Sequence, residues 1–538
     1  MQIKFYQVKI PPLSIKQFIN NLSLEQPLNS KDFEKRKKTF FGGQAYVPKN
    51  ADIRKVYNQL VQQQEILPNK QLEELLFSRK IRSASGVVVI TVLTKPYPCP
   101  GNCIFCPTEK KMPKSYLSNE PAAARAKMLK FNPYDQVQAR LKVLALNGHP
   151  IDKIELIVLG GTFSYLNKHY QTWFIKECFR AANDFPANRK PFHGSLEKEK
   201  KLNEQAKQRI IGLTMETRPD FIDKKEIIRL RKLGFTRVEL GAQTVFDDIL
   251  KLNQRQHSTQ DSIYATKLLK NAGFKISYHL MPGLFGSNAK KDLQLFQIIF
   301  NNQNFRPDQL KIYPCTVTKD SELYHLWKAG KYQPLSNHQN IILTKKIKQL
   351  VPPYVRISRL IRDIPESSIV AGPNITNLRQ KLQEKQITCA CIRCREVKNN
   401  FSEKEKIVLH RFNYSASDGQ EIFLEFSSPN QKKLFALLRL RIPDKNNKSH
   451  FIPALRNTAL IREVHTYGRL VAIKSKRDNS PQHIGLGKKL IKEAERIAQQ
   501  EFGLTKIAVI SGVGVRNYYQ KLGYQLHNEY MVKWLTKE

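Results

Sequence analysis

The sequence is poor in acidic residues. Its 538 residues include 46 Asp and Glu but 90 Lys and Arg, which leaves a formal net charge of +44. An excess of this size indicates a polyanionic partner, most simply a nucleic acid. A solubilising surface or a bias of composition would explain part of it, since the 41% of hydrophobic residues is ordinary for a globular chain.

Long apolar runs and an export signal are also missing. The first residues, MQIKFYQVKIPPLS, contain no apolar stretch as long as a signal peptide needs, and no run of about eighteen apolar residues predicts a membrane span. The eight cysteines fall mostly in two tight clusters. In a large chain without an export signal, such clusters are typical of metal ligands rather than disulfides. We therefore expect a cytoplasmic protein with no membrane partner.

The basic residues are dense in the first part of the chain, residues 1–75. Cations alternate there with aromatic residues: Lys31, Lys35, Arg36, Lys37, Lys38, Arg54 and Lys55 with Phe33, Phe40, Phe41, Tyr46 and Tyr57. Cations neutralise phosphates and aromatic rings stack on unpaired bases, so this region is a candidate nucleic-acid-binding region. A solvated helix face is the alternative.

Residues 76–385 alternate between short β-branched runs and longer amphipathic segments. Strands are predicted at 87–93, 154–160, 209–215, 236–242, 276–281 and 309–314, and helices near 121–147, 167–183, 223–233, 259–272, 290–302 and 337–350. Apolar runs with little alternation favour a parallel sheet buried on both faces. Six βα units in series predict an α/β fold, an open or incomplete β/α (TIM-like) barrel.

A Cys-rich segment, residues 386–400, separates this barrel from a second α/β unit at 401–538. Strands of that unit are predicted near 421–426, 434–442, 458–466, 469–473 and 506–511, with helices at 485–500 and 515–522. We find no internal repeat in the sequence.

Three cysteines lie in one short loop directly after the first predicted strand, with the spacing Cys99-x3-Cys103-x2-Cys106. Three thiolates can bind three irons of a 4Fe–4S cluster and leave the fourth iron open to another ligand. Zinc is the alternative, but structural zinc normally takes four protein ligands. Loops at the carboxyl ends of barrel strands carry the chemistry, so this position favours the cluster, which Phe105 would shield.

This spacing is similar to the signature of the radical S-adenosylmethionine (SAM) superfamily. There a glycine-rich end of the second strand receives the amino group of SAM, which the resemblance assigns here to Gly160, Gly161 and Thr162. Glu216 and Gln243 end the next two strands and would also contact SAM at the barrel opening, with Glu216 a catalytic candidate. A simple turn at the glycines and helix capping at the other two positions are the alternatives.

A second glycine motif opens a helix in the C-terminal unit. Its residues are Gln482, His483, Ile484, Gly485, Leu486, Gly487 and Lys488. Such a turn presents free backbone N–H groups to a pyrophosphate. It resembles the acetyl-CoA-binding motif of the Gcn5-related acetyltransferase (GNAT) fold, in which tyrosines placed like Tyr518 and Tyr519 lie beside the thioester. Core packing is the alternative for one of the two.

The second cysteine group is Cys389-x-Cys391-x2-Cys394. Its spacing favours structural zinc, with the fourth ligand supplied from elsewhere. Cys315, just after the last predicted barrel strand, is our candidate. A second iron–sulfur cluster and buried free thiols are the alternatives, and Cys178 is expected in the core.

A radical SAM barrel fused to a GNAT domain closely resembles the family of Elongator catalytic subunits, which carboxymethylate the wobble uridine of tRNA. The resemblance runs from about Arg82 to the C-terminus, through RSASGV (82–87), ELIVLGGTF (155–163), METRPD (215–220), VELGAQTVFDDIL (238–250), LKIYP (310–314), RDIPES (362–367), CIRCREV (391–397), LIREVHTYG (460–468) and ISGVGVRNYYQKLGY (510–524). Eukaryotic relatives carry a longer first spacing in the cysteine loop. The chain is therefore similar to the stand-alone prokaryotic type, for which other Elongator subunits are not required.

The resemblance implies a tRNA carboxymethyluridine synthase that uses a 4Fe–4S cluster, SAM, acetyl-CoA and an electron donor, with zinc as a structural ion. A 5′-deoxyadenosyl radical would take hydrogen from the methyl group of acetyl-CoA. The carbon radical would add to the 5-position of the wobble uridine in the anticodon stem-loop, and thioester hydrolysis would leave a carboxymethyl group. The uridine must leave its stack for this reaction.

This reaction requires the acetyl group to reach the barrel mouth, so we expect the two domains to face each other around it. Glu463 and His465, on a strand of the second unit, could orient a water or form a structural hydrogen bond.

Two other functions are compatible with the sequence. A GNAT protein lysine acetyltransferase with a structural iron–sulfur barrel would acetylate an amine without consuming SAM, although the charge of +44 disfavours it unless its target is acidic. A non-catalytic RNA-binding scaffold would tolerate replacement of Cys99, Cys103 and Cys106.

Overall fold

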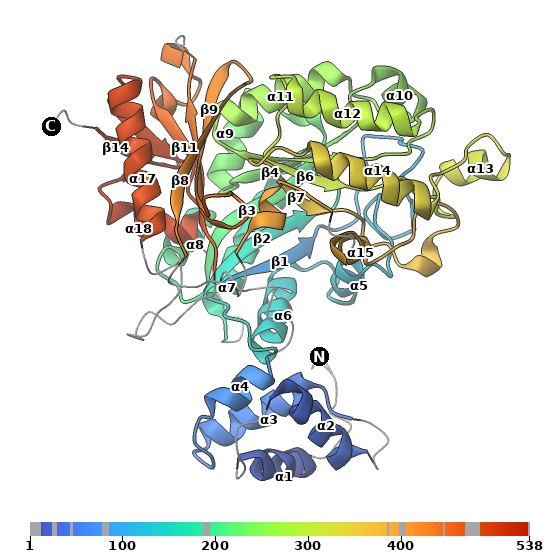
Figure 1. Ribbon diagram of the computed structural model, residues 1–538, viewed down its shortest axis with the longest axis vertical. Helices are drawn as coiled ribbons and strands as arrows, with labels where there is room; N and C mark the ends of the chain where they lie inside the picture. The colour runs from blue at the N-terminus through green and yellow to red at the C-terminus, as the bar shows by residue number, and fades with distance from the viewer. Residues whose placement is uncertain are drawn as a thin grey trace.

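The computed structural model describes residues 12–23, 29–42, 47–77, 86–186, 194–384, 387–397, 405–444, 447–468 and 485–535. These residues form an N-terminal group of helices, a parallel sheet wrapped by helices, and a mixed sheet with a helix on its face (Figure 1). No helix in these ranges has the length and apolar character that crossing a membrane requires.

The N-terminal helices have a core of their own. They are α1 (Pro12–Ser23), α2 (Ser30–Phe41), α3 (Asn50–Gln62) and α4 (Lys70–Leu75). They lie apart from both sheets, below the barrel in Figure 1, and the Phe77 ring that follows them packs edge-on against His149, with 5.1 Å between the ring centroids.

The expectation that the aromatic residues of this region stack on bases is wrong for three of them. Phe33, Phe41 and Tyr57 are at most 1% exposed and form the core of the helix group. Tyr46 lies outside the described residues. The cations meet the expectation better, since Lys31, Lys35, Arg36 and Lys38 are all exposed on α2. Those aromatic side chains hold the helices together and are not available to bases. A polyanion could therefore bind this region only through its exposed cations.

The barrel consists of seven parallel strands in the order β1 to β7, with the first and last strand at the two edges of the sheet. The strands are β1 (Val87–Leu93), β2 (Lys153–Leu159), β3 (Arg209–Thr217), β4 (Arg237–Gln243), β5 (Lys275–Leu280), β6 (Gln309–Ile312) and β7 (Arg356–Arg359). Six of them match the predicted strands to within two residues, and the expected incomplete α/β barrel is confirmed. The seventh strand was missed because its four residues, Arg-Ile-Ser-Arg, contain a single apolar side chain.

Helices accompany this sheet, most of them on its outside. They are α5 (Pro121–Met128), α6 (Pro133–Leu146), α7 (Lys168–Asp184), α8 (Leu196–Asn203), α9 (Lys224–Leu233), α10 (Asp247–Leu252), α11 (Thr259–Asn271), α12 (Ala289–Asn301), α13 (Leu323–Lys328), α14 (Asn337–Leu350) and α15 (Leu378–Glu384). Helix α13 projects beyond the carboxyl ends of the strands (Figure 1). The single helix predicted over 121–147 is wrong. Lys130 and Phe131 adopt positive φ angles there, and Asn132 caps a new helix whose first residue is Pro133.

The mixed sheet has the order β13-β14-β12-β11-β10-β9-β8. Its elements are α16 (Ile392–Arg395), β8 (Val408–Ala416), β9 (Gly419–Ser427), β10 (Leu434–Ile442), β11 (Ala459–Thr466), α17 (Leu486–Arg496), β12 (Lys506–Val509), α18 (Arg516–Gln520), β13 (Gln525–His527) and β14 (Tyr530–Trp534). Strands β8, β13 and β14 were not predicted, and the strand predicted at 469–473 lies outside the described residues. Strands β11 and β12 pair in parallel over three residues only, after which β11 continues alone beside β10.

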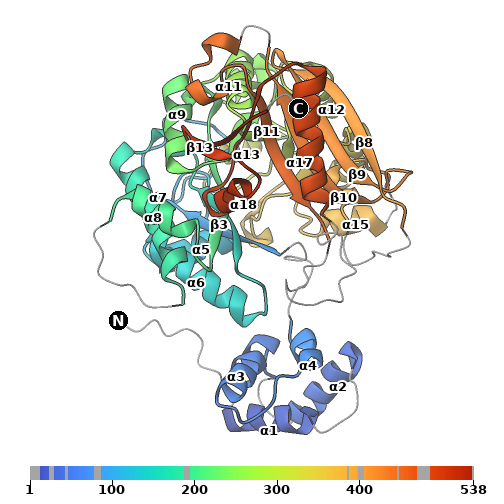
Figure 2. The same ribbon diagram turned by 90° about the vertical axis from the view of Figure 1, so that its left-hand side faces the viewer.

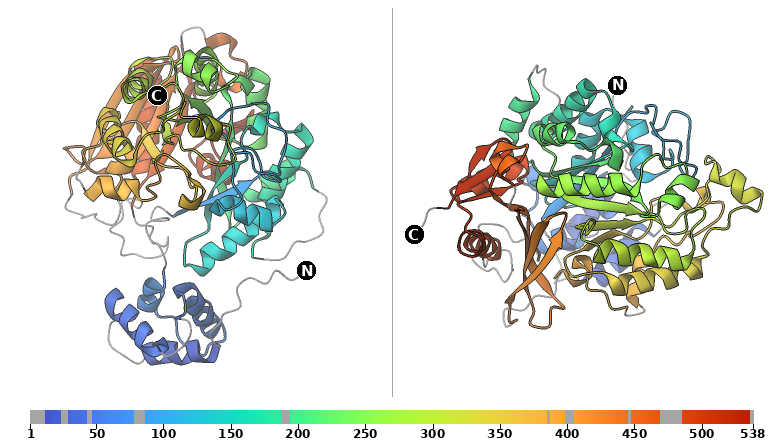
Figure 3. Two further views of the ribbon diagram at one scale, coloured as in Figure 1. Left: turned by 90° about the vertical axis from the view of Figure 1, so that its right-hand side faces the viewer. Right: turned by 90° about the horizontal axis from the view of Figure 1, so that it is seen from above.

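The mixed sheet packs against the end of the barrel where the strands begin. Figure 1 and the right panel of Figure 3 show the sheet and α17 on one side of the barrel and α13 on the other, and Figure 2 looks at the molecule from the side of this sheet. Asp308, just before β6, accepts hydrogen bonds from both terminal nitrogens of Arg462 on β11, at 3.0 and 2.5 Å. Arg462 also donates to Glu421 at 2.8 Å, and Lys270 of the barrel lies 3.8 Å from Asp308.

These side chains are at most 1% exposed. Burial raises the pKa of the Asp308 carboxyl, but Arg462 and Lys270 outweigh that effect and hold the pKa well below its usual range. The barrel and the mixed sheet are therefore joined by buried charges, and each charge is stable there only because its partner is present.

We predict that Arg462→Met destabilises the protein by about 3–5 kcal/mol, because it leaves Asp308 and Glu421 buried without their main counter-charge. Denaturant unfolding would measure the loss. Arg496→Met is the matched control: Arg496 pairs with Glu493 and Glu501 but is 43% exposed, so its loss should cost under about 1 kcal/mol. Equal effects of the two variants would contradict the prediction.

Candidate active site

The loop that carries Cys99, Cys103 and Cys106 lies across the carboxyl ends of the barrel strands. It leaves β1 and is held on the far side by backbone hydrogen bonds. The Ile104 N–H donates to the Asn253 carbonyl at 3.3 Å, and the Thr108 N–H donates to the Asp320 carbonyl at 2.7 Å. The sequence prediction that these cysteines stand at the barrel mouth is confirmed.

Two arginines make the surroundings of this loop electropositive. Arg255 donates a hydrogen bond to the Cys103 sulfur at 3.4 Å. Arg218 forms two hydrogen bonds with Asp220, and its third nitrogen, Nη1, is buried with no partner among the described residues. That nitrogen fills the space beside Gly101, where a Cβ atom would lie 2.3 Å from it.

The hydrogen bond with Cys106 and the charge of Arg255 lower the pKa of Cys103 to about 5, against the opposing effect of burial. Thiolates are the form that binds metal, and positive charge favours them. The loop therefore fits an anionic iron–sulfur cluster held by Cys99, Cys103 and Cys106. Sequence reasoning did not find Arg255, because nothing in the string NQRQH marks it as a partner of a loop 150 residues earlier.

The two cysteine sets differ in geometry. The sulfurs of Cys389, Cys391 and Cys394 all lie within 4.8 Å of one another, whereas those of the mouth loop do not form such a group. Ligands of one ion must lie close together, while each cysteine of a cluster binds a different iron. The geometry thus separates a one-ion site at 389–394 from a cluster site at 99–106.

Cys315 does not join the second set, so its prediction as the fourth ligand is wrong. The group of potential ligands contains the three neighbouring cysteines alone among the described residues. Cys315 is fully buried in an apolar cluster with Val317, Leu323 and Tyr332. Cys178, as expected, is core.

The predicted SAM contacts lie at adjacent strand ends. Gly160 and Gly161 have φ angles of +135° and +90°, and a Cβ atom on Gly160 would lie 1.9 Å from Oγ1 of Thr94. Gln243, at the end of β4, has a φ of +66°, which is strained for a residue with a side chain, and its Oε1 is buried with no partner among the described residues. Such strain is common where a side chain is held for a ligand.

Below these strand ends, side chains that point into the barrel form a charged group, which we call the lumen cluster: Glu216, Glu239, His279 and Lys311. Glu216 accepts a hydrogen bond from the Tyr116 hydroxyl at 2.5 Å. Glu239 and His279 are 3.0 Å apart, and Lys311 pairs with the same carboxylate. Of these four, the sequence pointed only to Glu216. The other three lie one each on β4, β5 and β6. In strands this short, the alternation that would mark them as pointing into the barrel is only a weak sequence signal.

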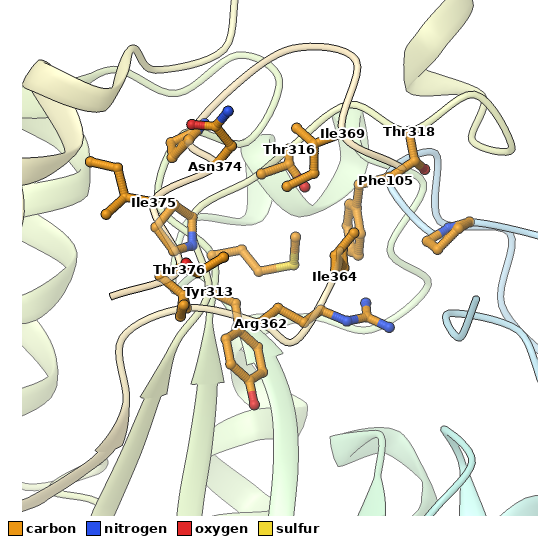
Figure 4. Close-up of a pocket in the computed structure, with 15 residues that line it drawn as sticks. Phe105, Tyr313, Thr316, Thr318, Arg362, Ile364, Ile369, Asn374, Ile375 and Thr376 are labelled. Atoms are coloured by element: carbon orange, nitrogen blue, oxygen red, sulfur yellow. The ribbon is translucent and has the colours of Figure 1, made fainter. Parts of the chain in front are cut away.

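A pocket opens beside the third cysteine, with about 670 Å³ of space that includes its opening to solvent. Figure 4 shows Phe105 and Arg362 on one side and Ile375 and Thr376 on the other. Its walls are mostly apolar, with one aromatic ring close to the cluster loop. A flat ring system of a ligand would fit between them.

The glycine motif of the second unit lies at the start of α17, next to the end of β11. Gly485 caps the helix with a φ of +72°, and a Cβ atom on Gly487 would lie 3.5 Å from Thr466 and 3.8 Å from the Tyr518 hydroxyl. The first N–H groups of such a helix have no partner within it. Gln482, His483 and Ile484 lie outside the described residues.

The two predicted tyrosines have different environments. Tyr518 is 37% exposed and faces the turn, while Tyr519 is buried against Tyr524. The interpretation of one tyrosine as core therefore applies to Tyr519.

The expectation that the two domains face each other around the barrel mouth is wrong. Strand β11 docks at the opposite end, where Lys275 at the start of β5 pairs with Glu463 at 3.2 Å. Glu463 also accepts a hydrogen bond from Arg439, so it is a structural partner rather than a free carboxylate. The two candidate sites thus lie at opposite ends of the barrel lumen.

Known proteins with the same architecture are found by comparison of sequences and structures. The model of the Radical SAM superfamily matches residues 96–297, and that of the Radical_SAM C-terminal domain matches residues 307–387. The chain is 45% identical over 483 residues to the tRNA uridine(34) acetyltransferase of Methanocaldococcus infernus, covering 87% of this chain and 89% of the relative. It is 37% identical to human Elongator complex protein 3, covering 87% of each. A solved structure of the M. infernus Elp3 with an N-terminal deletion superposes with a TM-score of 0.72 at 42% identity, over 84% of this chain and 100% of that one.

The two cysteine geometries generate a prediction about metal content. After anaerobic reconstitution, Cys103→Ser should lose iron and keep zinc, and Cys394→Ser should do the reverse, because each serine removes one thiolate from one site. Cys315→Ser should change neither. Elemental analysis with absorption spectroscopy measures both metals, and loss of zinc in the Cys315 variant would show that our placement of this residue is mistaken.

Proposed function

This chain belongs to the family of the tRNA uridine(34) acetyltransferases and Elongator complex protein 3, and we propose that it carboxymethylates the wobble uridine of tRNA. At the level that family membership fixes, it is a radical SAM, tRNA-modifying acyltransferase. The proposal adds that the two-carbon unit comes from acetyl-CoA and ends as a carboxymethyl group on C5. The observation that supports it is the position of the three-cysteine loop and of the glycine turn at the start of α17, at the two ends of one polar lumen.

At the mouth, Cys99, Cys103 and Cys106 would hold a 4Fe–4S cluster. Such a cluster, when bound, supplies the electron that opens SAM to a carbon radical, and an external donor restores that electron. Arg255 and Arg218 balance the negative charge of the thiolates. The exposed backbone of Gly160, Gly161 and Thr162 would take the amino group of SAM, with Glu216 and Gln243 at the neighbouring strand ends.

The pocket beside Cys106 would take the adenosine of SAM. Phe105 offers a ring for stacking, and Ile361, Ile364 and Ile375 give the apolar walls that a purine requires. Bound there, the sulfonium end would lie against the cluster loop.

In the mixed sheet, the start of α17 would bind the pyrophosphate of acetyl-CoA. Gly485, Leu486, Gly487 and Lys488 present their N–H groups at the positive end of the helix dipole. The preceding residues Gln482, His483 and Ile484 belong to the same proposed motif. Tyr518 would lie beside the thioester, because its hydroxyl is 3.8 Å from the position that a Cβ atom on Gly487 would take.

Basic side chains would bind the phosphates of transfer RNA, and the barrel mouth would bind its wobble base. The region 1–75 contributes the exposed cations of α2, and the net charge of +44 extends the attraction over the rest of the chain. We assign 76–385 to the radical SAM barrel and 401–538 to the GNAT acetyl-CoA domain. The wobble base would have to leave its stack to reach the mouth.

Zinc at Cys389, Cys391 and Cys394 would be structural, within the linker 386–400. The adjacent Arg395 forms two hydrogen bonds with Glu425 of the mixed sheet, at 2.7 and 2.8 Å, and a third with the Pro353 carbonyl of the barrel at 2.9 Å. The ion would hold this turn in the shape that joins the two parts.

The direct test is mass spectrometry of nucleosides from tRNA incubated anaerobically with the reconstituted enzyme, SAM and acetyl-CoA. We expect 5-carboxymethyluridine and 5′-deoxyadenosine together, each dependent on both cofactors, and neither from a Cys99, Cys103 and Cys106 triple alanine variant. An enzyme that acetylates protein amines without SAM, and leaves the uridine unchanged, would contradict the proposal.

The glycine turn at β2 gives a second prediction. Gly160→Ala would place a methyl group against Thr94 at a positive φ, which costs about 1–3 kcal/mol and should weaken SAM binding by roughly tenfold or more. Gly503→Ala is the matched control, since Gly503 also has a positive φ, of +62°, but lies in open space. Equilibrium binding measures the affinity of each variant for SAM. Equal affinities of the two variants would show that Gly160 is not part of the SAM site.

A further inference from the structure

The barrel lumen is polar, and water reaches the end of it that lies next to the mixed sheet. Side chains that point into it near the mixed sheet remain partly exposed: Glu155 by 26%, Lys275 and Arg356 by 21% each, and Glu463 by 12%. The lumen cluster stands between this region and the mouth. A substrate that extended through the lumen from the acyl-CoA turn to the cluster loop would pass beside His279.

His279 is arranged as a base. Burial raises the pKa of the Glu239 carboxyl, but Lys311, the hydrogen bond from His279 and Arg237 outweigh that effect and lower this pKa. An ionised carboxylate fixes the tautomer, since Nε2 of His279 must then carry the proton and donate it to Glu239 at 3.0 Å. In the neutral imidazole Nδ1 then carries the lone pair, and the described residues show no hydrogen bond to this atom.

A bound metal ion is the competing interpretation of this cluster, because the ligand atoms of Glu216, Glu239 and His279 lie within 4.8 Å of one another. The ammonium group of Lys311 already occupies the Glu239 carboxylate, and Arg237 lies 4.0 Å from its other oxygen. Two cations at this position would repel a third. The cluster instead combines a base with a positive charge held close to it.

We propose that the lumen cluster is the site of thioester hydrolysis, with His279 as the general base, Glu239 as its positioning residue and Lys311 as the group that stabilises the oxyanion. The inference rests on the proposed function, which requires water to attack the acyl thioester once its carbon is joined to the uridine.

The step balances without another reagent. Nδ1 of His279 takes a proton from water as the oxygen attacks the carbonyl carbon, and the Lys311 ammonium stabilises the charge on the carbonyl oxygen. The carbon–sulfur bond then breaks, and the imidazolium returns the proton to the departing sulfur. The products are free coenzyme A and a carboxylic acid on the nucleoside, which loses its proton to solvent and becomes the carboxylate.

Replacement of the base tests the site. In His279→Gln, formation of 5-carboxymethyluridine should fall by about 100-fold or more, while 5′-deoxyadenosine is still released in the first turnover. The uridine should then carry the intact coenzyme A thioester, which mass spectrometry of the tRNA would detect. Glu239→Gln keeps a partner for Nε2 but removes its charge, and should trap the same adduct, which a merely disordered lumen could not form.

The exposed His527 on β13 provides the control, and His527→Gln should behave as the unaltered protein. The inference is overturned if His279→Gln makes product at the normal rate, if it loses 5′-deoxyadenosine as well, or if the adduct accumulates in His465→Gln instead. Failure of the unaltered enzyme to carboxymethylate tRNA would overturn the proposed function itself. Normal product without a trapped adduct in the variants would overturn this inference alone.

Discussion

The arrangement of the whole molecule depends on one buried set of charges at the start of the barrel strands. Asp308 and Lys270 belong to the barrel, while Arg462 and Glu421 belong to the mixed sheet, and all are sealed from water. Charges in such a place are tolerated only when each faces its partner, so the set admits one docking geometry. That geometry turns β11 toward the lumen and leaves the opposite end of the barrel open.

This docking explains how two distant sites can serve one reaction. In the proposed reaction the loops of the mouth bind the cluster, SAM and the nucleobase, and the described strands of the mixed sheet do not cover them. The acyl-CoA turn lies behind, where β11 and β12 diverge. Between them the seven strands enclose charged side chains rather than an apolar core, and Lys275 and Arg356 pair with Glu463 and Glu396 at the end next to the mixed sheet. Under the proposal, the lumen is part of the active site.

The sequence predicted elements whose signal is local. Six barrel strands were placed to within two residues, since short β-branched runs buried on both faces have few alternatives. The Cys99 loop and the Gly485 turn were found because each needs fixed residues at fixed spacing. Local reasoning failed where the signal was weak: β7 has one apolar residue, and the break between α5 and α6 rests on two positive φ angles.

The sequence by itself determined which parts the protein has: a parallel barrel, a three-cysteine loop, a second α/β unit and an excess of positive charge. Only the tertiary structure decided which residues meet. It placed Arg255 against Cys103, removed Cys315 from the zinc set, buried Phe33 and Phe41 in a helix core, and brought His279 to Glu239. The reason is physical: spacing along the chain fixes neighbours within a turn or a strand, whereas contacts across a barrel follow from how strands register and domains dock, and these are set by burial summed over hundreds of residues.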